Sequence, residues 1–335
     1  MASKFLPGSK NPVRRVSRMP ENSQQNFAGI EVALRTLRGV VISGDGRTLD
    51  RCEATYEPDE LIRSVSDVTR ELQKSGKIEL VGLAIPGLVN RETDRVLVST
   101  GLPFTARDHI HSDLMEATGL RFELENDANA AAYGEYKAGA GRDARDIFYI
   151  SIGDAIGGAI ILEGKLWTGS LGCAGEIGHI TIDTEGAECV CGNTGCLETI
   201  ASGPNIVRRA RERLNRDNTS SLSRLAMQDT FTAADLALEA NNGDDFSVMM
   251  LERTGVSIGI AVASIINLLS IERIILGGAV MEAGDLLLKP IINETRQRSF
   301  QECFDATEIV AAELGVEGVA IGAALLARDA QLVTM

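Results

Sequence analysis

Long apolar runs are absent from this 335-residue sequence, which contains no stretch of 18 consecutive apolar residues. A membrane-spanning helix needs about 20 such residues, so the sequence predicts none. The first 26 residues also lack the apolar segment and the cleavage pattern of a secretory signal. We therefore expect a cytoplasmic protein without a membrane partner.

Basic residues are outnumbered as well: the chain has 33 basic and 47 acidic residues, so its net charge is −14. Such a chain is poorly suited to bind nucleic acid or an anionic membrane surface. Residues 1–26 are the exception, with Lys4, Lys10, Arg14, Arg15 and Arg18 against Glu21. We interpret this segment as a disordered tail. The alternative is a nucleic-acid-binding arm, but the segment lacks the apolar periodicity of a helix-turn-helix.

Histidine occurs only three times, and one copy lies close to a cluster of cysteines. Cys189, Cys191 and Cys196 have the spacing C-x-C-x4-C, and His179 lies ten residues before them. Three thiolates and one imidazole complete the tetrahedral shell of a structural zinc ion. The alternative is three buried free cysteines and an unrelated histidine. We expect the other three cysteines to be small packing residues: Cys52, Cys173 and Cys303.

Strand and helix patterns alternate along the chain, which predicts an α/β fold. Two strand-turn-strand patterns, near residues 29–43 and 147–162, occupy corresponding places in two halves. Helical periodicity covers residues 58–76, 247–270 and 316–332. Two similar halves indicate a cleft between domains, where ligand sites are common.

Asn126 and Asp127 lie where a predicted strand passes into a helix. An aspartate there is typical of a helix N-cap. The alternative is a general base that accepts the proton of a hydroxyl attacking a phosphoryl group. The pair alone does not decide between the two.

Five segments are found in the order and spacing of a known family: "GLAIPGLV", "ENDANAAAYGE", "GSLGCAGEIGH", "CVCGNTGCLETIAS" and "ERIILGGAVMEAGDLLL". From about Phe27 to about Arg328 the chain resembles the ROK family of repressors, open reading frames and kinases. The resemblance implies an actin-like, hexokinase-like (ribonuclease H-like) fold, in which two α/β domains flank a central cleft and one carries a zinc loop. It also implies a homodimer.

Domain limits and site residues follow from this resemblance. It implies a small domain at residues 27–126, joined by the C-terminal helix at about 317–333, and a large domain at 127–316 with the zinc loop and the sugar site. Asp127 would be the catalytic base, and zinc would be bound by His179, Cys189, Cys191 and Cys196. The residues implied to contact sugar are Gly87, Asn126, Asp127, Glu176, His179 and Glu198.

The phosphate-binding turns depart from the family pattern. Where family kinases read like "DxGGT", this chain has "EVALRT", and where they read like "GTGIGGG" it has "GDAIGGA". A carboxylate such as Asp154 at about 4 Å from a phosphate oxygen costs on the order of 4 kcal/mol at an effective dielectric constant near 20. The nucleotide-binding glycines that remain are Gly153, Gly157, Gly277 and Gly278. We hypothesise an Arg35–Asp154 ion pair across the phosphate site; alternatively, Arg35 binds the phosphate itself.

Three functional hypotheses follow. The first is a cytoplasmic protein that binds a hexose or N-acetylhexosamine, with a degenerate ATP-phosphate site and weak or absent kinase activity. The second is an active ATP-dependent sugar kinase that uses Mg²⁺, and Asp127 as general base. The third, a transcriptional regulator, is the least favoured, because family repressors carry some sixty or more residues ahead of the sugar domain and this chain has about 26.

Overall fold

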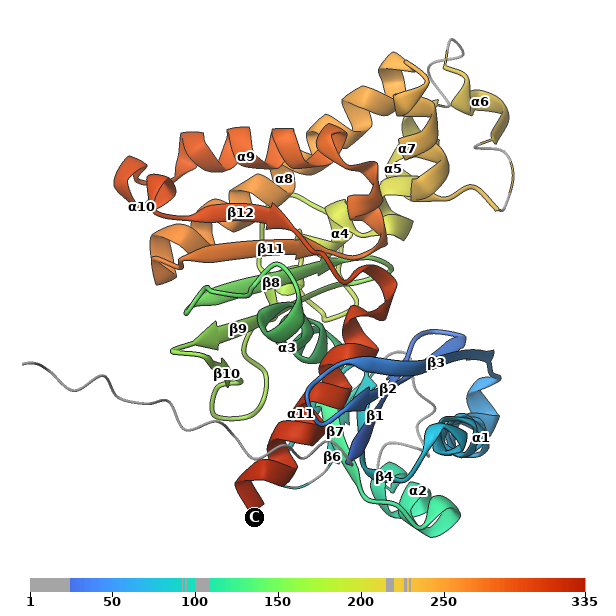
Figure 1. Ribbon diagram of the computed structural model, residues 1–335. Helices are drawn as coiled ribbons and strands as arrows, with labels where there is room; N and C mark the ends of the chain where they lie inside the picture. The colour runs from blue at the N-terminus through green and yellow to red at the C-terminus, as the bar shows by residue number, and fades with distance from the viewer. Residues whose placement is uncertain are drawn as a thin grey trace, which may run out of the picture.

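The computed structural model describes residues 25–91, 93, 95–99, 109–214, 220–225, 228 and 230–334. The predicted disordered tail therefore lies almost entirely outside the described residues. Its last residue, Asn26, is already the first residue of strand β1 (Asn26–Val32). Two five-stranded sheets lie one above the other, and helices α3 (Asp127–Ala138) and α11 (Gly318–Thr334) run between them (Figure 1).

The first sheet has the strand order β3-β2-β1-β4-β7. Its first three strands are antiparallel, and β4 and β7 extend the sheet in parallel. Their bounds are Thr48–Thr55 for β3, Thr36–Ser43 for β2, Ile78–Ile85 for β4 and Phe122–Asn126 for β7. Helices α1 (Leu61–Leu72) and α2 (Ile110–Thr118) share one hydrophobic core with this sheet. A small hairpin, β5 (Leu88–Asn90) and β6 (Arg95–Val98), follows β4.

The second sheet repeats this plan with the strand order β10-β9-β8-β11-β12. Its strands are β8 (Ile147–Ile152), β9 (Ile156–Leu162), β10 (Lys165–Trp167), β11 (Arg273–Gly277) and β12 (Glu308–Ala311). The hairpins β1–β2 and β8–β9 take the same place in their sheets, so the prediction of two corresponding hairpins is confirmed. The other helices belong to this half (Figure 1): α4 (Glu198–Ala201), α5 (Gly203–Leu214), α6 (Leu222–Leu225), α7 (Ala233–Asn241), α8 (Asp245–Leu269), α9 (Asp285–Arg298) and α10 (Gln301–Asp305).

Alternation along β8 separates two cores. Phe148 and Ile150 face the core shared with α8 and α9, whereas Ile147 and Tyr149 face the core shared with α3 and α11. A strand buried on both faces reads as a continuous apolar run, which is how "IFYISI" reads in the sequence.

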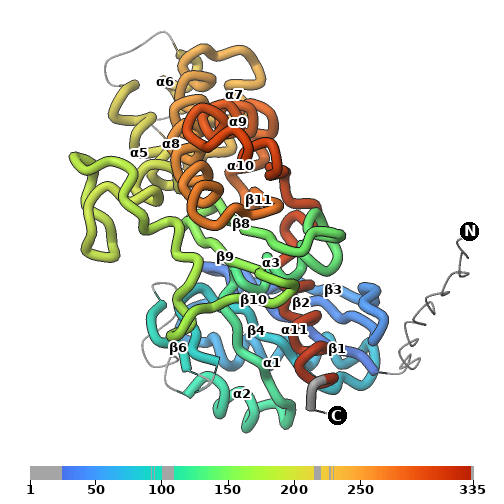
Figure 2. The backbone as a smooth tube through the Cα atoms, turned by 90° about the vertical axis from the view of Figure 1, so that its left-hand side faces the viewer, coloured from blue at the N-terminus to red at the C-terminus, as the bar shows by residue number. Residues whose placement is uncertain are grey.

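Small residues allow α3, α11 and the first sheet to approach closely. A Cβ at Gly322 of α11 would lie 1.7 Å from the carbonyl oxygen of Ala130 in α3. A Cβ at Gly82 of β4 would lie 2.0 Å from the carbonyl oxygen of Ala323. The backbone of α11 thus rests directly on both neighbours, and Figure 2 shows it beside β1 and α3 from a second direction.

Helix α8 is long and apolar enough to cross a membrane by length and composition alone. However, 61% of its most apolar window is buried inside the protein, where it packs against α9 and α7. A core helix of a globular domain has this property.

Candidate functional site

The four predicted metal ligands come together in one cluster. The ligand atoms of His179, Cys189, Cys191 and Cys196 all lie within 4.8 Å of one another. The Cys189 Sγ–His179 Nδ1 distance is 3.5 Å, and the Cys191 Sγ–Cys196 Sγ distance is 3.7 Å. Zinc bonds of about 2.3 Å to sulfur and 2.0 Å to nitrogen at tetrahedral angles imply a sulfur–nitrogen separation of about 3.5 Å and a sulfur–sulfur separation of about 3.8 Å. These two separations therefore match those of a tetrahedral Cys₃His site.

Tight turns shape the loop that carries these ligands. The Cys189 N–H donates to the Asn193 carbonyl, and the Gly192 N–H donates to the Cys189 carbonyl. Gly195 has a positive φ of 68° and passes so close to the Asp183 carbonyl that no side chain fits there. Val190 is 82% exposed, so the loop tip has little apolar packing of its own. A bound metal would supply the cross-link that such a loop lacks.

Asn126, and not Asp127, caps helix α3. Its side-chain oxygen accepts the Asn129 N–H at 2.9 Å, and its side-chain nitrogen donates to the Gly87 carbonyl at 2.9 Å. The same nitrogen donates to Asp127 Oδ1 at 3.0 Å, and the Ala128 N–H donates to that oxygen at 2.9 Å. Of the two alternatives left open by the sequence, the N-cap role of Asp127 is wrong, because the preceding asparagine provides the cap.

Carboxylates from both halves of the molecule act on Asp127 electrostatically. Burial raises the pKa of Asp127 to about 6; the Ala128 N–H opposes this rise, while the carboxylates of Glu31 and Glu176 add to it. Glu31 comes from the first sheet, whereas Glu176 lies in the loop after β10. An aspartate whose pKa lies near neutrality suits a general base.

Of the remaining predicted sugar-contacting residues, Glu176 contacts the metal cluster and Glu198 contacts the second turn. Glu176 Oε2 lies 3.9 Å from His179 Nε2, the ring nitrogen that faces away from Cys189. Glu198 Oε2 accepts the N–H of Ile156, which lies within the "GDAIGGA" segment, at 2.9 Å. Gly87 has a φ of 133°, and a Cβ there would lie 2.2 Å from the Val98 carbonyl oxygen. Two pairs of the predicted sugar-contacting residues are therefore in contact: Gly87 with Asn126, and Glu176 with His179.

In the first turn, charged side chains pair within their own sheet. Arg38 Nη1 donates to Glu31 Oε2 at 3.2 Å, and Arg38 Nε lies 3.6 Å from Glu53 Oε2. Burial raises the pKa of Glu31 and Arg38 opposes the rise. The sequence interpretation missed Arg38, although the short turn at residues 33–35 makes Glu31 and Arg38 direct cross-strand partners.

The hypothesised Arg35–Asp154 ion pair is wrong: both residues are described, and no ion pair joins them. Arg35 Nη1 instead lies 2.7 Å from Glu57 Oε2, with both side chains exposed. Strand pairing explains this partner, since Thr36 of β2 faces Thr55 of β3 and the Tyr56 N–H donates to the Arg35 carbonyl. Glu57 is therefore held beside Arg35 by the sheet itself.

Internal hydrogen bonds occupy several backbone amides of the two turns. The Ala33 N–H donates to the Thr36 carbonyl, the Gly153 N–H donates to the Ala155 carbonyl, and Glu198 takes the Ile156 N–H. Leu34, at a position where the family has glycine, is 61% exposed.

The predicted nucleotide glycines gather around these turns. A Cβ at Gly278 would lie 2.4 Å from the Ile152 carbonyl oxygen, so the third turn packs on the strand before the second. A Cβ at Gly277 would meet the Tyr149 hydroxyl at 2.4 Å. A Cβ at Gly157 would lie 3.0 Å from Ala128 Cβ, which places the second turn beside the start of α3. The Gly203 N–H at the start of α5 donates to the Gly153 carbonyl.

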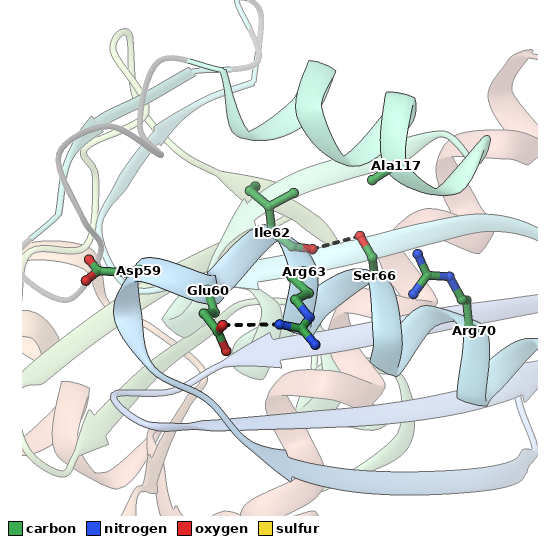
Figure 3. Close-up of a pocket in the computed structure, with 7 residues that line it drawn as sticks. All are labelled: Asp59, Glu60, Ile62, Arg63, Ser66, Arg70 and Ala117. Carbon is green, nitrogen blue, oxygen red and sulfur yellow. Dashed lines mark hydrogen bonds and ion pairs between the residues drawn. The ribbon is translucent and has the colours of Figure 1, made fainter.

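A surface pocket lies between α1 and α2 (Figure 3). It is lined by Asp59, Glu60, Ile62, Arg63, Ser66, Arg70 and Ala117. Its arginine Arg63 pairs with Glu60 one turn earlier, at 3.2 Å. None of the predicted sugar, nucleotide or metal residues lines it, so we leave it out of the candidate site.

Replacing Asp127 with asparagine should stabilise the protein at high pH. The folded-state pKa near 6 exceeds the usual 3.8, so the ionised carboxylate disfavours folding increasingly as pH rises from about 4 to 6, and fully above that range. We expect the unfolding free energy of Asp127→Asn to exceed the wild-type value by about 1–3 kcal/mol at pH 8. This gain should shrink toward zero near pH 4, as measured by urea unfolding. Asp154→Asn, at an exposed carboxylate, is the control, and an Asp127→Asn gain that does not vary with pH would contradict the assignment.

Comparisons with known proteins agree with this geometry. The chain is 33% identical to a glucokinase of Halalkalibacterium halodurans over 325 residues, covering 92% of this chain and 96% of that protein. A ROK family glucokinase of Streptomyces griseus, solved with glucose and AMPPNP, superposes with a TM-score of 0.82 at 29% identity, covering 91% and 99% of the two chains. A ROK family transcriptional regulator, a homologue of the E. coli MLC protein, superposes with a TM-score of 0.83 at 27% identity, covering 93% and 81%.

A sequence model of the ROK family matches residues 27–330. The match includes both sheets, the cysteine loop and the Asn126–Asp127 junction. It accounts for the actin-like, hexokinase-like arrangement that the sequence motifs predict. The chain belongs to the ROK family.

Proposed function

We propose that the protein binds a hexose or N-acetylhexosamine in the cytoplasm and transfers phosphate from ATP weakly or not at all. The observation that carries this proposal is the contrast between the two parts of the site. The residues assigned to sugar hold one another through Asn126, Asp127 and Gly87, whereas the charges of the first phosphate turn are paired within its sheet.

Three features of the phosphate turns disfavour the binding of Mg-ATP. A phosphate needs backbone N–H groups, and those of Ala33, Gly153 and Ile156 already donate elsewhere. It also needs positive charge, but Arg35 is paired with Glu57, and Asp154 adds a carboxylate. Glu31 is in contact with Arg38, so a magnesium ion would have to displace that guanidinium.

A second function, an active sugar kinase, is favoured by Asp127. A protein that only binds sugar needs no general base, yet this carboxylate is not used as the helix cap and its pKa is raised to about 6. The glucokinase relatives of H. halodurans and Thermotoga maritima, at 33% and 30% identity, point in the same direction. In that function Asp127 would take the proton of the sugar hydroxyl, and magnesium would neutralise the phosphates.

Calorimetry separates the two functions. We expect one of glucose, N-acetylglucosamine and N-acetylmannosamine to bind the wild-type protein, with Mg-ATP giving no heat up to about 1 mM. A coupled assay with the bound sugar should then show no phosphoryl transfer above background. Sub-millimolar binding of Mg-ATP together with turnover would contradict the proposal and establish the kinase.

We further propose that the Cys₃His cluster holds zinc and that the protein forms a homodimer. Purified protein should contain one zinc per chain, and Cys196→Ser should lose it, because this buried thiolate is one of only four ligands. Sugar affinity and the midpoint of thermal unfolding should fall with the metal, since His179 also contacts Glu176. Metal analysis checks the first point, with Cys303→Ser as the matched control. A Cys196→Ser variant with full zinc content would refute the ligand set.

A further inference from the structure

Glu125 is a buried carboxylate that none of the roles above uses. It lies at the end of β7, directly before Asn126, and is 4% exposed. Its Oε1 atom accepts the Asn126 N–H and the Asn129 side-chain amide, both at 2.9 Å. Its Oε2 atom is buried without a hydrogen bond and lies 3.3 Å from Arg91 Nη1. One carboxylate thus contacts the residue that caps α3, the next turn of α3 and a distant arginine.

Arg91 lies at the turn of the β5–β6 hairpin, and its side chain is 41% exposed. This hairpin begins directly after Gly87, whose carbonyl accepts the Asn126 side chain. The hairpin is therefore attached to the end of β7 at two places, through Gly87–Asn126 and through Arg91–Glu125. It also meets the second half, because a Cβ at Gly172 would lie 2.5 Å from the Val89 carbonyl oxygen.

The charge of Arg91 stabilises the buried Glu125 carboxylate and thereby the arrangement of the residues bonded to it. Burial raises the pKa of Glu125 and Arg91 opposes the rise, followed by the Asn129 and Asn126 hydrogen bonds. A buried carboxylate that loses its cation is strongly unfavourable and must take up a proton or draw in other donors. The Asn126 N–H and the Asn129 side-chain amide already donate to this carboxylate. Loss of Arg91 would therefore shift the segment that contains Asp127.

We propose that Arg91 and Glu125 are positioning residues for the sugar, which fix the hairpin against β7 and thereby set the places of Gly87, Asn126 and Asp127. Neither residue needs to touch the sugar. The inference rests on the proposed sugar site and adds two residues that act through it.

A double-mutant cycle in sugar affinity tests this role. The variants are Arg91→Met, which keeps the apolar stem, Glu125→Gln, which keeps the shape, and the two combined. Arg91→Lys is the conservative variant. Arg142→Met removes an arginine from the exposed Arg142–Glu313 pair and is the matched control. Dissociation constants are measured for glucose, N-acetylglucosamine and N-acetylmannosamine at 25 °C, where circular dichroism shows each variant folded.

Arg91→Met and Glu125→Gln should each weaken binding of the preferred sugar about tenfold, and the double variant also about tenfold, since coupled residues are not additive. Arg91→Lys should stay within about twofold of the wild type, and Arg142→Met should not differ from it. Wild-type affinity in Arg91→Met, or losses that multiply to about a hundredfold in the double variant, would overturn the positioning role. A wild-type protein that binds none of the three sugars would instead refute the proposed function, and the inference with it.

Discussion

The hydrogen bond from the Asn129 N–H to the Asn126 side chain determines how the candidate site is built. Because Asn126 provides the N-cap of α3, the Asp127 carboxylate is not needed as the cap and lies at the junction of strand and helix, where it accepts the Ala128 N–H. That junction lies at the carboxyl end of a parallel strand, and ligands of α/β sheets commonly bind just outside these strand ends. The Gly87 carbonyl, Glu31 and Glu176 reach it from three other segments. The desolvated carboxylate that results is costly to the fold, as functional sites often are.

The two parts of the candidate site differ in how their polar side chains are paired. On the side that we propose to bind sugar, hydrogen bonds extend from Gly87 through Asn126 to Asp127, and Glu176 contacts His179. In the first predicted phosphate turn, Glu31 pairs with Arg38 and Arg35 pairs with Glu57. Because kinases and a transcriptional regulator share this fold with the chain, the fold itself does not decide between catalysis and binding. We infer that the residues of the two phosphate turns determine whether the protein catalyses phosphoryl transfer or only binds its ligand.

The sequence predicted those features that arise from residues close together in the chain. The two hairpins, the long helix α8 and the Cys₃His cluster all follow from periodicity or from spacing within about 20 residues. Helices α5, α7 and α9 were not predicted; α9 contains Pro290 inside it, which weakens a helical pattern. The role of Asp127 was left open, since an aspartate at the start of a helix suits both an N-cap and a general base; Asn126 was not predicted as the cap. The partner of Arg35 was predicted wrongly, because Glu57 is 22 residues away and reaches it only through strand pairing.

The central claim is that the two phosphate turns alone limit catalysis in a site whose sugar side is complete. The most direct test restores both turns to the family pattern, with Glu31→Asp, Ala33→Gly, Leu34→Gly, Arg35→Thr, Asp154→Thr, Ala155→Gly and Ala159→Gly in one variant. Phosphoryl transfer from Mg-ATP to the sugar that the wild type binds most tightly is then compared between the two proteins. The account predicts background transfer by the wild type and clear transfer by the restored variant, because Asp127 is unchanged in both. Equal rates in the two proteins, whether high or undetectable, would contradict it.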